Sequence, residues 1–179
     1  MSRYVAFLRG MNLGRRRIKN AELCDRFREM GLGQPTAFLA SGNVVFDSPD
    51  RDVDALSARI EGGLRQSLGY DVPTFLRSAA EVRRIARRRL FAERSAEMKG
   101  KVQVILLRGL PKPAARREVE GLATADDLLS VVGKQVFWLP RGSILSSELD
   151  LAAIARVVGP LTIRTHRTLV RLVDRFLAP

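Results

Sequence analysis

Hydrophobic residues in the first half of the chain follow two different spacings. Short, nearly continuous apolar runs are typical of buried strands, and they occur at residues 4–8, 36–39, 44–46 and 72–76. Two segments, residues 20–31 and 52–68, instead repeat apolar residues with a helical period, and Asn20 and Gly31 are the expected ends of the first helix. The order strand, helix, strand, strand, helix, strand is that of a ferredoxin-like unit.

The second half of the chain predicts the same order of elements. Strands are expected at residues 102–107, 128–132, 136–139 and 161–164, and helices at residues 113–123 and 147–158. Ser147 and Asp150 have the spacing of a capping box at the start of the second of these helices. A final helix is predicted at residues 168–177.

Two short sequences recur between the halves. Leu8-Arg9-Gly10 returns as Leu107-Arg108-Gly109, 99 positions later, and residues 42–46 resemble residues 133–137, 91 positions later. An internal duplication explains both matches. The predicted fold is therefore α/β (α+β), a tandem duplication of two ferredoxin-like βαββαβ units. The expected domains are residues 1–78, a basic connecting helix at residues 79–98, and residues 99–179, which end in a C-terminal helix.

Composition narrows the class of protein. The 179 residues carry 31 Lys and Arg against 19 Asp and Glu, a formal net charge of +12, which is compatible with a polyanionic partner. One Cys and one His exclude disulfide scaffolds, zinc fingers and thiolate clusters, and no metal is expected. No cofactor is expected either. The absence of a signal-peptide pattern and of a long apolar stretch predicts a cytoplasmic protein without a membrane partner.

The segment after the first strand is the leading candidate site. Gly10 and Gly14 allow backbone N–H groups to approach an anion, and the segment ends at the predicted start of a helix, whose dipole favours negative charge. No acidic residue precedes Glu22. The candidate anion or nucleic-acid ligands in this segment are Arg9, Asn12, Gly14, Arg15, Arg16, Arg17 and Lys19. The alternative is a glycine-shaped turn with solvated arginines.

Two further groups of residues are candidates. Ser41 and Asn43 form a tight turn between two predicted strands, and the fold places this turn beside the first loop, because the first and third strands are neighbours. A secondary basic patch on the connecting helix consists of Arg83, Arg84, Arg87 and Arg88. Like charges four residues apart destabilise a helix slightly, so bound phosphates or nearby acids would offset the repulsion. A solvated helix face explains the same pattern.

The segment YVAFLRGMNLG, the helix that begins near Ala21, and the segment FLASGNVVF together resemble the bacterial family known as domain of unknown function 1697. The resemblance extends over the whole chain in order. Its most specific residues are Arg9, Gly10, Asn12, Gly14, Ser41, Gly42, Asn43 and Phe46. Near the C-terminus, Thr162, Arg164 and Thr168 fit a Thr-rich segment of the family. The chain departs from the family pattern at Arg15 and at Thr165-His166-Arg167. The resemblance implies a tandem pair of ferredoxin-like units and brings no activity with it.

The sequence favours a non-enzymatic protein that binds an anionic ligand, above all the nucleic-acid backbone, through residues 9–19. The alternative is an enzyme that acts on a small phosphorylated substrate, with the same loop as an anion clamp and Ser41, Asn43 or His166 for orientation or proton transfer. A third hypothesis is an interaction module that recruits protein through strand edges. Cys24 lies on the apolar stripe of the first helix and is expected to be buried and inert. The sequence does not determine the oligomeric state.

Overall fold

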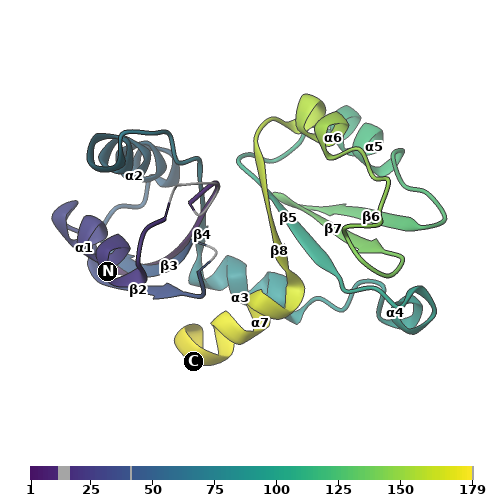
Figure 1. Ribbon diagram of the computed structural model, residues 1–179, viewed down its shortest axis with the longest axis horizontal. Helices are drawn as coiled ribbons and strands as arrows, with labels where there is room; N and C mark the ends of the chain where they lie inside the picture. Colours follow the sequence, from purple (N-terminus) through teal and green to yellow (C-terminus); the bar gives the residue numbers. More distant parts are fainter. Residues whose placement is uncertain (12–16, 41, 179) are drawn as a thin grey trace. The chain divides into compact units, whose positions relative to one another are not determined.

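A computed structural model describes residues 1–11, 17–40 and 42–178 of the chain (Figure 1). The chain forms two compact units. The first comprises Met1–Arg83 together with the segment that begins at Asp174, and the second comprises Arg84–Val173. Among the described residues no helix combines the length and apolar character needed to cross a membrane. Nor do three or more potential metal ligands cluster anywhere in these ranges.

The first unit is a four-stranded antiparallel sheet with two helices on one face (Figure 1). The strands are β1 (Ser2–Leu8), β2 (Gly33–Phe38), β3 (Asn43–Ser48) and β4 (Thr74–Ser78), in the spatial order β2-β3-β1-β4. The helices are α1 (Asn20–Glu29), α2 (Val53–Leu68) and α3 (Ala79–Arg87), whose last turn belongs to the second unit. This is the ferredoxin-like order of elements that the sequence predicts.

The second unit repeats the arrangement. Its strands are β5 (Gln103–Leu107), β6 (Asp127–Val132), β7 (Gln135–Pro140) and β8 (Leu161–Thr165), in the order β6-β7-β5-β8. Its helices are α4 (Ala92–Met98), α5 (Pro113–Glu120), α6 (Leu151–Val158) and α7 (His166–Leu172), and α7 continues into the π-helical turn η1 (Val173–Leu177). The duplicated ferredoxin-like fold is thereby confirmed.

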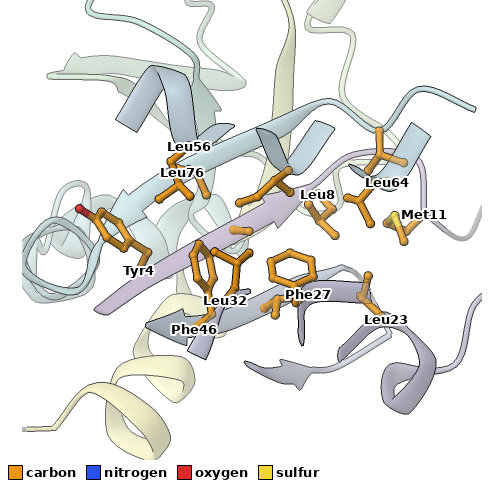
Figure 2. Close-up of a cluster of buried hydrophobic side chains, with 14 residues drawn as sticks. Tyr4, Leu8, Met11, Leu23, Phe27, Leu32, Phe46, Leu56, Leu64 and Leu76 are labelled. Carbon is orange, nitrogen blue, oxygen red and sulfur yellow. The ribbon is translucent and has the colours of Figure 1, made fainter. Parts of the chain in front are cut away.

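Apolar side chains of α1 and α2 fill the space over one face of the first sheet (Figure 2). Phe27 of α1 is fully buried, and its ring meets that of Phe46 of β3 edge to face, with 5.4 Å between the centroids. Residues at helical spacing on α2, Leu56, Ile60 and Leu64, complete the cluster. The apolar periodicity of the sequence therefore identifies the face that each helix buries.

Strand register corrects one of the two repeat matches. Val44 lies opposite Ala6 in the first sheet, and Val136 lies opposite Ile105 in the second. Because Ala6 and Ile105 are 99 positions apart, the hairpins correspond at 92 positions and not at 91. A shift of one residue would turn every side chain of a strand to the other face.

The repeat also includes the helix that follows the last strand of each unit. Ser78 Oγ accepts a hydrogen bond from the backbone N–H of Glu81 at the start of α3, and Thr165 Oγ1 accepts one from Thr168 at the start of α7. Two buried residues of α3, Val82 and Ile85, correspond to Leu169 and Leu172 of α7. The predicted final helix thus begins two residues early, at His166, and is the counterpart of α3.

The predicted connecting helix at residues 79–98 is two helices. The chain leaves helical geometry after Arg87, and Phe91, with φ of 62°, adopts the left-handed conformation before α4 begins at Ala92. The break allows α3 to belong to the repeat, whereas α4 has no counterpart in the first unit.

Two predicted helix caps are wrong. The residue that precedes α1 in the cap position is Lys19 and not Asn20, which is already helical. Helix α6 begins at Leu151, and Asp150 caps it by accepting a hydrogen bond from Ala153 N. Ser147 takes no part in a capping box, because its hydroxyl donates to Asp127 Oδ1 and accepts from Leu149 N.

Segment 174–178 completes the first unit at its sheet edge. The ring of Phe176 packs edge to face on Phe38 of β2, with 5.6 Å between the centroids. Two arginines of the first unit bind backbone carbonyls of this segment: Arg3 donates to Phe176 O at 3.5 Å, and Arg83 donates to Leu177 O at 2.9 Å. Leu177 itself is buried. Residues distant in sequence are therefore part of this unit's packing.

Adjacent glycines in α2 should respond differently to substitution. A Cβ at Gly62 would have nothing within 4 Å, so Gly62→Ala is expected to raise the free energy of unfolding by about 0.5–1 kcal/mol through helix propensity. A Cβ at Gly63 would lie 2.9 Å from Met30 Cγ, so Gly63→Ala should be about 1 kcal/mol less stable than Gly62→Ala. Urea unfolding of both variants checks this, and equal stabilities would contradict it.

Candidate anion-binding site

The end of β1 is held between a hairpin and a neighbouring strand. The backbone N–H of Leu8 donates to Gly42 O at 2.7 Å, and that of Arg9 donates to Pro73 O at 2.9 Å. Gly42 has a φ of 71°, and a Cβ there would lie 2.9 Å from the Cγ of buried Met11. The glycine lets the β2–β3 hairpin contact the start of the first loop. The expected proximity of this loop and this hairpin is confirmed for these residues.

The described cations of the first loop have no carboxylate partner. Arg9, Arg17 and Lys19 are exposed, and none makes a side-chain hydrogen bond or ion pair with another described residue. In contrast, Arg28 and Arg65 of the same unit pair with carboxylates, at 2.5 Å and 2.7 Å. Positive charge is therefore not neutralised within the described chain at this loop, whereas it is at Arg28 and Arg65.

Helix α1 begins beside these cations without a side-chain cap. Lys19 occupies the cap position with extended backbone angles, φ −73° and ψ 148°, and its side chain makes no capping hydrogen bond. The N-termini of α2 and α6 are instead capped by Asp52 and Asp150. Backbone N–H groups in the first turn of α1 therefore have no side-chain acceptor at the cap position, and such groups favour an anion.

The structure assigns Asn43 to the hairpin itself. Its side chain is fully buried, and its amide nitrogen donates to Phe38 O at 2.9 Å across the turn. This bond fixes the conformation of the hairpin and turns the amide inward. The remaining predicted ligands, Asn12, Gly14, Arg15, Arg16 and Ser41, lie outside the described residues.

The secondary basic patch divides into two kinds of arginine. Arg83 is half-buried and donates to Leu177 O, so it has a packing partner. Arg84, Arg87 and Arg88 are exposed, and their side chains form no hydrogen bond or ion pair within the ranges that the structure describes. Sequence alone could not separate Arg83 from the others, because its partner lies 94 residues away.

Two buried arginines were missed by sequence reasoning. Arg77 of β4 lies opposite Val5, and Arg164 of β8 lies opposite Val104, so the two occupy equivalent positions in the repeat. Each donates through Nη1 to the carbonyl of the preceding residue at 2.8 Å. Burial lowers the pKa of both to about 10, and for Arg77 the nearby charge of Glu81 opposes this. Both therefore remain charged at neutral pH.

Asp127 was also missed, because it directly precedes the strand predicted at residues 128–132. It is the first residue of β6 and is buried, and its Oδ1 accepts hydrogen bonds from Trp138 Nε1 at 2.7 Å and Ser147 Oγ at 2.6 Å. Its neighbour Asp126 is exposed and pairs with Arg141. Only the contrast between an acid and an otherwise apolar strand could have indicated this role.

His166 and the first loop lie in different units. The imidazole of His166 is half-buried, with Nε2 3.2 Å from Ile85 O and its ring 6.4 Å from that of Phe137. Cys24 is buried on α1, as predicted. The second unit also has a groove of about 490 Å³ between α5 and α6, whose lining includes Lys112 and Arg156. None of the residues predicted as ligands lines this groove.

Fold and site together define a duplicated ferredoxin-like α+β protein with a basic loop after its first strand. The chain belongs to the family described as Protein of unknown function (DUF1697), which matches residues 1–137. The conserved bacterial protein SP0830 from Streptococcus pneumoniae has a similar structure, with a TM-score of 0.72 and 20% sequence identity over 98% of this chain and 99% of that chain. This likeness shows a shared fold. No curated protein matches the chain.

Proposed function

We propose that the protein is a non-enzymatic binder of the nucleic-acid backbone and that residues 9–19 bind its phosphates. One observation carries the proposal: Arg9, Arg17 and Lys19 are exposed without a carboxylate partner in the described chain, next to the uncapped start of α1. Cations and free N–H groups at a helix start are the groups that bind phosphate oxygens in proteins.

Burial of both sheet faces favours binding to the nucleic-acid phosphates over stacking on the bases. Single-stranded RNA is often bound by aromatic side chains that stack on bases from an open sheet face. Here Phe7 and Phe75 pair across β1 and β4 on the sheet face opposite α1 and α2, and both are buried. Phosphate contacts without stacking predict binding that is sequence-independent and strongly dependent on salt.

Arg84, Arg87 and Arg88 are proposed as additional contacts, because they are exposed and have no carboxylate partner among the described residues. Arg83 is left out of this set, since its guanidinium already binds Leu177 O. The side-chain amide of Asn43 donates to Phe38 O. Because the enzyme alternative uses this amide to orient a substrate, the bond favours simple binding at the first loop.

The test is a fluorescence titration of single- and double-stranded oligonucleotides at about 50 and 200 mM salt. Parent protein is expected to bind with micromolar or tighter Kd at the lower salt and to weaken steeply at the higher. Arg17→Ala/Lys19→Ala should reduce the slope of log K against log salt by about 1.5, because two phosphate contacts are lost.

The matched control is Arg28→Ala/Arg65→Ala, which removes the same charge from two ion-paired arginines of the same unit. It should leave the slope nearly unchanged. An equal reduction of the slope in both variants would show that net charge alone drives binding and would refute a site at the first loop. Absence of binding at low salt would refute the proposal and direct the search to small phosphorylated metabolites.

A further inference from the structure

The second unit repeats the backbone contact that positions the first loop. The N–H of Leu107 donates to Lys134 O at 2.9 Å, as the N–H of Leu8 donates to Gly42 O. Strand registers make Leu107 the counterpart of Leu8 and Lys134 the counterpart of Gly42. The β6–β7 turn therefore holds the end of β5 in the same way as the β2–β3 hairpin holds the end of β1.

Three cations come from the elements that meet at this end of the second sheet. Arg108 follows β5 and is the counterpart of Arg9, and Lys112 occupies the cap position of α5, as Lys19 does for α1. Lys134 stands in the turn where the first unit has a glycine. Both Arg108 and Lys112 are exposed, and Lys134 is half-buried.

This segment, like the first loop, carries basic residues and no acidic ones. No Asp or Glu occurs between Gln103 and Arg117, and Glu118 is the first acid. The side chain of Lys112 forms no hydrogen bond or ion pair with any residue that the structure describes. This loop is shorter than the first, and the lysine in the turn adds a cation that glycine at the equivalent position lacks.

We propose that Arg108, Lys112 and Lys134 form a second phosphate-binding site, so that one protein molecule binds one nucleic-acid strand at two points. The inference rests on the proposed function of the first loop. Two similarly built sites match a polymer that repeats the same phosphate, not a small phosphorylated molecule. Once one loop is bound, the second binding step is intramolecular, and affinity rises without any new type of contact.

The proposal is tested with fluorescein-labelled oligo-dT strands of increasing length and the full-length chain. For the parent, affinity should rise by about 10-fold or more at the length that first reaches both loops. Lys112→Ala/Lys134→Ala should abolish this rise and change the affinity for the shortest strands by no more than about 2-fold, the statistical factor for two sites. Lys112→Arg/Lys134→Arg should retain the rise, because it retains the charges.

The matched control is Lys101→Ala/Arg117→Ala, which removes two exposed cations of the same unit and should keep the length-dependent rise. Thermal unfolding midpoints equal to the parent's confirm that each variant is folded. If the rise persists in Lys112→Ala/Lys134→Ala, the second site is refuted, and the first-loop variant still decides the proposed function. If neither loop's variant alters binding, both proposals fail.

Discussion

Asp127→Ala is expected to lower the free energy of unfolding of the second unit by about 3 kcal/mol. The carboxylate is buried and accepts hydrogen bonds from the Trp138 indole and the Ser147 hydroxyl. Its removal leaves the indole N–H, itself almost fully buried, without this acceptor, and each unsatisfied buried polar group costs about 1–3 kcal/mol. Because Trp138 is the only tryptophan, its fluorescence during urea unfolding reports this environment directly.

Asp126→Ala is the matched control for that variant. Asp126 is the adjacent residue with the same side chain, but it is exposed and its partner, Arg141, is half in solvent. Exposed ion pairs contribute about 0–1 kcal/mol, so this variant should unfold at nearly the parent's urea concentration. An equal loss of unfolding free energy from the two substitutions would contradict the assignment of Asp127 as a buried acceptor.

Phe27→Ala is expected to cost about 3–5 kcal/mol of stability in the first unit. The ring is fully buried, contacts Phe46 edge to face and belongs to the cluster that joins α1 to the sheet. Truncation removes a large apolar surface and leaves a cavity that fixed strands cannot fill. Far-UV circular dichroism during urea unfolding records both units and Trp138 fluorescence only the second, so a transition seen by circular dichroism alone measures the loss in the first unit.

Phe27→Leu provides the comparison within the same site. Leucine keeps most of the buried volume, so its cost should be well below that of alanine, at about 1–2 kcal/mol. A loss below about 1 kcal/mol for Phe27→Ala would show that the ring does not anchor α1, since buried Phe-to-Ala substitutions cost several times more.

Periodicity and turn residues predict the fold well, because both are local properties. Every strand and both helices of each βαββαβ unit occur within a few residues of the predicted ranges. The hairpin offset of 91 was wrong by one residue, because the match followed Gly133 in the turn, whereas strand pairing aligns Gly42 with Lys134. Pairing register depends on residues far apart in the chain, which a local match does not contain.

Candidate site residues were predictable only in part. A run of cations before a helix is visible in sequence, and Arg9, Arg17 and Lys19 are indeed exposed. Asn43 and Arg83 were not separated from the other candidates, because their hydrogen-bond acceptors are brought near only by folding. These acceptors are the carbonyls of Phe38 and Leu177. The burial of Arg77 and Arg164 also could not be predicted from the neighbouring sequence, because arginine is rarely found inside a protein.

The first unit is discontinuous in sequence, because it includes the segment that begins at Asp174. During synthesis, Phe176 and Leu177 leave the ribosome only after all of Arg84–Val173 has been made. Until then β2 lacks the ring that packs on Phe38, and Arg83 lacks the Leu177 carbonyl. The part of the protein that is translated first is thus the last for which the full set of contacts becomes available, although domains in general fold in the order of synthesis.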